Sequence, residues 1–339
     1  YRTAAIGKWH LGSRDEQHPN NRGFDLFYGM KAGGRDYFYN EKKSDRPGDE
    51  RNLLLNDRQV KFEKYLTDAF SEKAVEFINE SSQPFMMYLA YNAVHTPMQA
   101  TDEDMAKFEG HPRQKLAAMI YALDRGVGTV IRGLKDSGKF DNTLIFFLSD
   151  NGGATTNQSS NYPLKGFKGN KFEGGHRVPY FVVWKNGIPA GKPYDGLVSS
   201  LDIFATAIDA ASISKTRNRL DGVSLLPYLK GKKGEPHKVL YWRKMDTRAI
   251  RSGDYKLIIT HGVDSVLYNI RRDPEEMNNL INKEPDLYRK LAKKLAKWEK
   301  NECIEPSWLE EGWRKITNRY HQQLMHNEIK TAQDLYKKK

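Results

Sequence analysis

Residues 143–153 read TLIFFLSDNGG, an apolar run that stops at four polar or flexible residues. The run from Thr143 to Ser149 has the length and the nearly continuous apolar character of a strand buried in a parallel sheet. Asp150, Asn151 and two glycines follow it directly. They are therefore expected at the carboxyl end of the strand, where open α/β sheets bind their ligands.

Upstream of this stretch, helical and strand patterns alternate. A long amphipathic helix that ends at Ser137-Gly138 is predicted from apolar residues at helical spacing, namely Leu116, Ile120, Leu123, Val127, Val130, Ile131 and Leu134. Buried strands are predicted at residues 4–9 and 85–91, with a helix between them that has Thr67 as its N-cap. This alternation predicts an α/β fold with a mostly parallel sheet flanked by helices.

After about residue 230 the pattern changes. Short strands separated by turn residues are predicted at residues 239–242, 247–252, 255–259 and 265–269, which together form an antiparallel meander. A helix over residues 286–300 follows and carries an apolar face to cover that sheet, made of Leu287, Leu291, Leu295 and Trp298. The sequence thus predicts an α/β domain over residues 1–230, an antiparallel subdomain over residues 231–303 and an extension over residues 304–339.

The composition is globular and basic. The 339 residues are 38% hydrophobic and 29% charged, with a net charge of +12, which suits a nucleic acid, a membrane surface or an acidic substrate. No helix-turn-helix, zinc-finger or RNP pattern is present, which disfavours nucleic acid, and the apolar runs are too short to span a membrane. A polyanionic substrate fits best. The single cysteine, Cys303, excludes an intrachain disulfide.

Two segments place histidines beside predicted strands. Lys8 and His10 stand two residues apart, a spacing that puts both side chains on one side of an extended segment. A cation next to an imidazole suits a site that binds an oxyanion and transfers a proton. His95 directly follows the strand at residues 85–91. The alternative for each residue is a structural or solvated side chain.

Two further segments carry metal-type and cationic side chains. Asp150 and Asn151 offer hard oxygen ligands, which suit Ca²⁺ or Mg²⁺, although Asp-Asn-Gly is also common turn chemistry. Residues 164–179 form a glycine-rich loop with Lys165 and Lys168, whose cations are suited to surround an anion. The alternative for this loop is a solvated basic segment.

In this order and spacing, the motifs resemble the type I, formylglycine-dependent sulfatase family of the alkaline phosphatase superfamily. They are Gly-Lys-Trp-His-Leu-Gly at 7–12, Asn-Arg-Gly-Phe-Asp-Leu-Phe-Tyr-Gly at 21–29, His-Thr-Pro at 95–97, Ser-Asp-Asn-Gly-Gly at 149–153 and Lys-Gly-x-x-x-Glu-Gly-Gly-x-Arg-Val-Pro at 168–179. Tyr-Asn at 268–269 and Asp-Pro-Glu-Glu at 273–276 resemble the C-terminal subdomain of that family. The resemblance covers residues 1 to about 300.

The resemblance implies a role for each motif residue. Lys8 would bind the sulfate and hold the formylglycine, His10 would remove a proton from it, and His95 would contact the sulfate ester and protonate the leaving alcohol. Asp150 and Asn151 would supply half of the ligands of one Ca²⁺. Lys168 would bind sulfate near the bridging oxygen, with Lys165 as a second candidate.

The resemblance also implies a formylglycine made from a Cys/Ser-x-Pro-x-Arg motif, together with an Asp-Asp pair for the metal. In the family both lie upstream of the Gly-Lys-Trp-His-Leu-Gly motif, and residues 1–339 contain no such nucleophile motif. The segment at residues 303–307, CIEPS, has one residue too many before its proline and no arginine after it. Residues 1–339 alone are therefore expected to be inactive and to fold poorly, because the family's first strand is expected to be central in the sheet.

The family implies several further expectations. The substrate is expected to be a sulfated carbohydrate, the partner in maturation a formylglycine-generating enzyme, and the location periplasmic or secreted. Arg14, Arg35, Tyr37 and His176 lie near the motifs in sequence and are candidates for sugar contacts. The alternative functions are a phosphatase or phosphodiesterase of the same superfamily and a non-catalytic protein that binds sulfated glycans.

Overall fold

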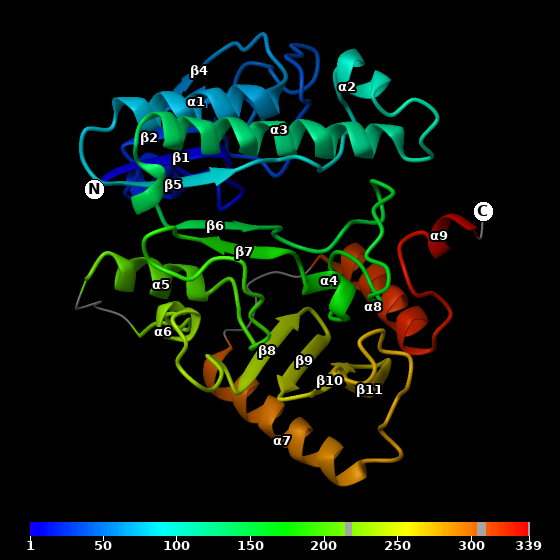
Figure 1. Cartoon of the computed structure of the whole chain (residues 1–339). Coiled ribbons are helices and arrows are strands. Elements are labelled where there is room, and N and C mark those ends of the chain that lie inside the picture. The colour runs from blue at the N-terminus through cyan, green and yellow to red at the C-terminus, as the bar shows by residue number, and fades with distance from the viewer. Residues whose placement is uncertain (214–218, 304–309, 338–339) are drawn as a thin grey trace. The chain divides into compact units, whose positions relative to one another are not determined.

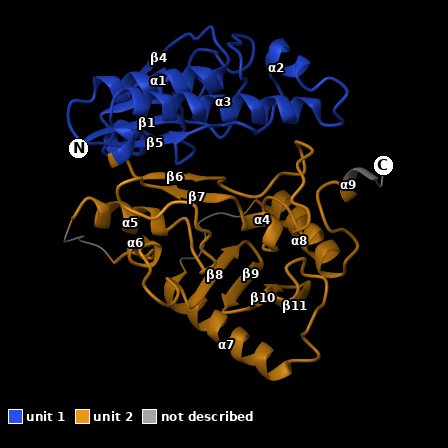
Figure 2. Cartoon of the chain, viewed as in Figure 1, with its two compact units in different colours: residues 1–141 blue, residues 142–339 orange. Residues whose placement is uncertain are grey.

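The computed structural model describes residues 1–213, 219–303 and 310–337 (Figure 1). The chain forms two compact units, Tyr1–Asp141 and Asn142–Lys339 (Figure 2). The domain limit expected at residue 230 falls inside the second unit. Of residues 303–307, only the partly buried Cys303 belongs to the described part of the chain.

The first unit is built on a five-stranded mixed sheet with the strand order β4-β3-β2-β1-β5. The strands are β1 Arg2–Lys8, β2 Leu26–Met30, β3 Leu54–Leu55, β4 Arg58–Gln59 and β5 Phe85–Ala90. β1 runs parallel to both β2 and β5, whereas β3 and β4 add an antiparallel ribbon. The strands predicted at residues 4–9 and 85–91 are confirmed. Because β1, β2 and β5 are parallel, their carboxyl ends meet at one edge of the sheet.

Two long helices, α1 (Leu66–Glu80) and α3 (Gln114–Asp136), pack side by side in the first unit (Figure 1). Their apolar faces form one core with the sheet, which includes Ala4, Ile6, Phe70, Ala74, Phe77, Met119 and Ala122. The N-cap predicted at Thr67 is wrong, because α1 begins at Leu66 and no side chain caps it. Instead, the Leu66 backbone N–H donates to the Tyr37 carbonyl, 2.9 Å away. The shorter helices are α2 Asp102–Ala106 and the 3₁₀ turns Asp15–Gln17, Pro19–Arg22 and Phe140–Asn142.

The second unit begins with an antiparallel strand pair, β6 (Ile145–Leu148) and β7 (Tyr180–Val183). The strand predicted at residues 143–149 is confirmed. It is not buried on both faces within this unit, since Phe147 is 40% exposed and its partner Phe181 is 58% exposed. Three short helices complete this part of the unit, α4 Glu173–His176, α5 Asp202–Ala210 and α6 Leu226–Leu229.

The predicted antiparallel meander is confirmed as a four-stranded sheet with the order β11-β10-β9-β8. Its strands are β8 Val239–Lys244, β9 Thr247–Ser252, β10 Tyr255–Thr260 and β11 Asp264–Asn269. Leu257 pairs in register with Ile250 on one side and Leu267 on the other, so all three residues share one face. That face packs on helix α7 (Pro285–Glu302) through Leu291 and Leu295.

The opposite face of this sheet supports the glycine-rich loop. Ala249, Ile258 and Val266 form a core with Phe167 and Phe172 of the loop. The helix α8 (Glu311–Met325) contributes Leu324 and Met325 to the same core, and α9 (Asp334–Lys337) follows it. The predicted single covering helix, α7, is therefore confirmed on one face, and the loop with α8 covers the other. None of the described helices is both long enough and apolar enough to cross a lipid bilayer.

Candidate active site

Lys8 and His10 lie at the carboxyl end of β1. The backbone of Trp9 and His10 continues the pairing with the neighbouring chain segment, through hydrogen bonds to Met30 O and Lys31 O of 2.9 and 3.0 Å. The strand itself ends at Lys8, and His10 has a left-handed backbone with φ of 53°. The prediction that the side chains of Lys8 and His10 point to the same side of one extended segment therefore does not hold, because the extended backbone ends before His10. Few non-glycine residues adopt this backbone conformation. Those that do are concentrated at functional sites.

A glycine pair, Gly33-Gly34, lies against the rings of both candidate histidines. A Cβ atom on Gly33 would lie 2.5 Å from the His10 ring, and one on Gly34 would lie 3.4 Å from His95 Nδ1. Because adjacent Cα atoms are only about 3.8 Å apart, both histidines occupy the same small region of the first unit. The structure thus brings together His10 and His95, which are 85 positions apart in sequence. The sequence analysis missed this glycine pair.

The loop that carries His95 is held by hydrogen bonds from a buried tyrosine. The Tyr37 hydroxyl contacts Asn92 O at 2.7 Å and His95 O at 2.9 Å. Burial raises the pKa of Tyr37 well above its usual value, so this hydroxyl stays protonated and can donate. The imidazole Nδ1 of His95 lies 2.8 Å from Thr96 O. A carbonyl can only accept, which places the hydrogen of the neutral ring on Nδ1.

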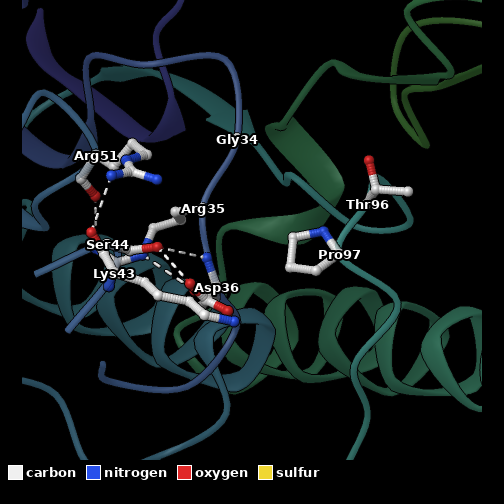
Figure 3. A pocket seen from close by; sticks show the side chains of 8 residues that line it. All are labelled: Gly34, Arg35, Asp36, Lys43, Ser44, Arg51, Thr96 and Pro97. Carbon is white, nitrogen blue, oxygen red and sulfur yellow. Dashed lines mark hydrogen bonds between the residues drawn. The ribbon is translucent and has the colours of Figure 1, made fainter. Parts of the chain in front are cut away.

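A polar pocket of about 420 Å³ lies next to this loop, within the first unit (Figure 3). Its lining residues are Gly34, Arg35, Asp36, Lys43, Ser44, Arg51, Thr96 and Pro97. The Arg35 side chain is fully buried and makes two hydrogen bonds to Asp45, of 2.7 and 2.8 Å. The expectations that Arg35 and Tyr37 contact a sugar are wrong, because both side chains are buried and serve the fold.

In the second unit, Asp150 and Asn151 follow β6 as predicted. Asp150 is exposed and Asn151 is half-buried. Their side chains offer a carboxylate and an amide oxygen, which are ligands of the type that Ca²⁺ prefers. Among the described residues, no group of three or more Asp, Glu, His or Cys side chains is arranged to hold a metal ion. The oxygen atoms of Asp150 and Asn151 are therefore suitable calcium ligands. The two residues supply only part of the six to eight oxygens that bind the ion.

Backbone contacts join the Asp150-Asn151 turn to the glycine-rich loop. The Gly152 N–H donates to Gly175 O at 3.0 Å, and the Lys168 N–H donates to Gly153 O at 3.0 Å. A side chain at position 152 would collide with the loop, since a Cβ atom there would lie 1.8 Å from Gly174 O. The structure thus brings Lys168 together with the candidate metal ligands.

Lys165, the second candidate for binding sulfate, lies inside the second unit. Its ammonium donates to Glu276 O at 3.1 Å and to Asn327 Oδ1 at 2.5 Å. Burial lowers the pKa of Lys165 to about 8. These contacts indicate a structural role for Lys165 and leave Lys168 as the candidate for binding substrate.

A buried ion network holds the loop from behind. The Lys256 ammonium, from β10, lies 2.8 Å from a carboxylate oxygen of Glu173 and 3.0 Å from one of Glu276. All three side chains are at most 1% exposed. Glu276 also accepts the backbone N–H of Glu173, at 2.6 Å. The loop motif and the Asp-Pro-Glu-Glu motif are thus joined through one lysine, which the sequence analysis did not single out.

The two carboxylates of this network titrate in opposite directions. Burial alone disfavours the charged form of both. For Glu173 burial raises the pKa, but the charges of Lys256 and Arg251 together outweigh burial and hold the pKa low. For Glu276 burial dominates, and the charge of Glu173 adds to it, so its pKa is raised.

His176, another candidate for a sugar contact, packs inside the second unit. Its ring stacks on Trp242 with centroids 4.6 Å apart, and its Nε2 lies 3.1 Å from Lys171 O. Burial lowers the pKa of His176 to about 3, so the ring is neutral at neutral pH. These contacts give His176 a packing role.

Comparisons with known proteins agree with this arrangement. A model of the sulfatase family matches residues 1–213, and a model of the N-sulphoglucosamine sulphohydrolase C-terminal region matches residues 168–301. The chain belongs to the sulfatase family. The predicted family is therefore confirmed, and the second match covers the glycine-rich loop from Lys168 onward together with the antiparallel sheet.

Individual relatives are sulfatases too. The chain is 37% identical to the uncharacterized sulfatase YdeN of Escherichia coli, over 71% of this chain and 47% of that protein. It is 30% identical to N-acetylgalactosamine-6-sulfatase of Canis lupus familiaris, over 76% of this chain and 51% of that protein. The chain thus spans about half the length of these curated relatives.

A solved structure matches nearly the whole chain. Ps i-CgsB, in complex with k-i-k-neocarrahexaose, aligns with a TM-score of 0.84 and 36% identity. The alignment covers 94% of this chain and 76% of that one. The alkaline-phosphatase-like fold expected from the motifs is confirmed by this likeness.

Replacing Lys256 by methionine is expected to destabilise the protein by about 3–5 kcal/mol, because it removes the fully buried cation that two buried carboxylates share. Denaturant unfolding of the full-length protein measures this. Lys290→Met, on the exposed side of α7, is the matched control and should change stability by less than about 0.5 kcal/mol. Adding Glu276→Gln to Lys256→Met should recover part of the loss. An unchanged unfolding midpoint for Lys256→Met would contradict a structural role of the network.

Proposed function

We propose that this chain forms part of an enzyme that hydrolyses sulfate monoesters of carbohydrates. The observation that carries the proposal is the joining of Lys168 to the Asp150-Asn151 turn by backbone hydrogen bonds, in a chain of the sulfatase family. The names of the relatives support a sulfated sugar as substrate, since one acts on N-acetylgalactosamine 6-sulfate and another binds a neocarrahexaose. The net charge of +12 suits a polyanionic substrate.

In this proposal each candidate residue has a separate role. Lys168 binds the sulfate oxygens and stabilises the charge that develops as the ester bond breaks. Lys8 also binds sulfate. His95 acts in its protonated, imidazolium form: it gives the proton on Nε2 to the leaving alcohol, while the proton on Nδ1 stays bonded to Thr96 O. His10 accepts a proton, held in place by its backbone hydrogen bond and by the space that Gly33 leaves.

The proposal includes two groups beyond the side chains of residues 1–339. Asp150 and Asn151 would hold a calcium ion, which would stabilise negative charge on the substrate. The nucleophile would be a formylglycine outside residues 1–339, made by a formylglycine-generating enzyme. We expect such a protein to be periplasmic or secreted.

The reaction class is tested with the full-length protein, coexpressed with a formylglycine-generating enzyme. We expect release of sulfate from N-acetylgalactosamine 6-sulfate or another sulfated sugar, and no comparable release of phosphate from the matching phosphate ester. Residues 1–339 alone should release neither, because binding residues cannot replace an attacking group. Preferential phosphate release would favour the phosphatase alternative. Binding of sulfated sugar without turnover would favour a non-catalytic protein.

Lys168→Ala is expected to lower kcat by about a hundredfold or more, the scale for loss of one preorganised group that stabilises the transition state. Steady-state kinetics of the full-length enzyme measure this, with Lys290→Ala as the control for removing a surface charge. An unchanged kcat with a raised KM would show that Lys168 attracts substrate without acting in the transition state.

Asp150→Ala is expected to remove both the bound calcium and the activity, because it deletes a charged ligand from a hard-oxygen site. Metal content after dialysis, measured by atomic emission, gives a readout that does not depend on turnover. Asp57→Ala, in an exposed turn of the first unit, should retain both. Stoichiometric calcium in the Asp150 variant would remove this residue from the metal site.

A further inference from the structure

Three lysines gather beside the loop that carries Lys168. Lys168 and Lys171 belong to the loop itself, and Lys244 comes from the end of β8. The Lys244 ammonium lies against the loop backbone, since a Cβ atom on Gly169 would be 3.1 Å from its Nζ. All three residues are half-buried, so their charges are poorly hydrated but still within reach of a ligand.

In the part of the chain that the structure describes, no anion pairs with any of these three ammonium groups. The carboxylates nearest to them in sequence are already engaged. Asp246 accepts hydrogen bonds from Arg314 and Asn318, both at 2.7 Å. Glu173 is bound by Lys256, at 2.8 Å.

The lysines therefore act on one another. Burial and the charges of Lys244 and Lys256 lower the pKa of Lys171 to about 8. Burial and the charge of Lys168 lower the pKa of Lys244. Like charges held close together in a partly buried place are unfavourable unless an anion joins them. Such a cluster is suited to bind an oxyanion.

Two elements fix the geometry of the cluster independently of any ligand. Lys244 shares one face of β8 with Trp242, which stacks on His176 of the loop. Lys171 is held through its carbonyl, which lies 3.1 Å from His176 Nε2. Stacking thus fixes the end of β8 that carries Lys244, and the hydrogen bond fixes the backbone of Lys171 in the loop that Lys244 approaches. Binding a ligand would therefore cost little backbone ordering.

We propose that Lys171 and Lys244 form a second oxyanion position beside Lys168, which takes a further sulfate group of the same carbohydrate. This rests on the proposed function and names its substrate class, a carbohydrate with at least two sulfate groups. Lys168 binds the group that is removed. Lys171 and Lys244 bind the group that is kept, and they select substrates that carry it.

The test is calorimetric binding of N-acetylgalactosamine 6-sulfate and 4,6-disulfate to the full-length protein, a measurement that needs no turnover. The wild type should bind the disulfate at least about tenfold more tightly, since a hydrogen bond to a charged group is worth that factor or more. Lys244→Met should lose this preference and keep its affinity for the monosulfate. Lys244→Arg should retain the preference, and so should the matched control Lys290→Met.

The outcomes separate the two proposals. A Lys244→Met variant that is folded by circular dichroism and still prefers the disulfate overturns the second position, as does a wild type without any preference. If Lys244→Met does not fold, Lys171→Gln, compared with Lys171→Arg, answers the same question. Failure of the wild type to hydrolyse either sugar would count against the proposed function, while the binding data would still decide the role of Lys171 and Lys244.

Discussion

The ion network around Lys256 is the constraint on which the second unit depends. One ammonium from the C-terminal sheet lies between Glu173 of the glycine-rich loop and Glu276 of a distant turn, and water is excluded from all three groups. Charges buried in this way are tolerated only when each has its partner. The position of Lys168 therefore depends on a strand that begins at Tyr255 and never approaches the candidate metal ligands in sequence.

In the first unit, backbone geometry and not a buried ion network positions the candidate histidines. Parallel pairing of β1 with β2 and β5 brings three strand ends together. Gly33 and Gly34 then let the rings of His10 and His95 approach one short loop. A buried Tyr37 holds the loop of His95 through two carbonyl groups. In both units, residues without any catalytic chemistry of their own decide where the candidate catalytic side chains lie.

Local patterns in the sequence were sufficient to predict most elements. β9 has the predicted bounds Thr247–Ser252, because the turn residues Asp246 before it and Gly253-Asp254 after it mark both of its ends. The family motifs likewise indicated Asp150 and Lys168, which lie within short segments. Burial of Lys165 could not be predicted in this way, since it follows from contacts with Glu276 and Asn327, more than a hundred positions away. The left-handed backbone of His10 is likewise set by neighbouring strands and not by its own sequence.

The antiparallel sheet supports the loop on one face and, at the end of β8, also presents a charged side chain beside it. The structural role of Lys256 and the proposed binding role of Lys244 thus belong to the same small sheet but to different strands, β10 and β8. If Lys244 binds a second sulfate as proposed, substitutions at the tip of the β8–β9 hairpin would alter which sugars are accepted without changing the proposed catalytic residues. Substrate specificity could then be varied at this hairpin, by natural selection or by protein engineering, while the reaction itself stays the same.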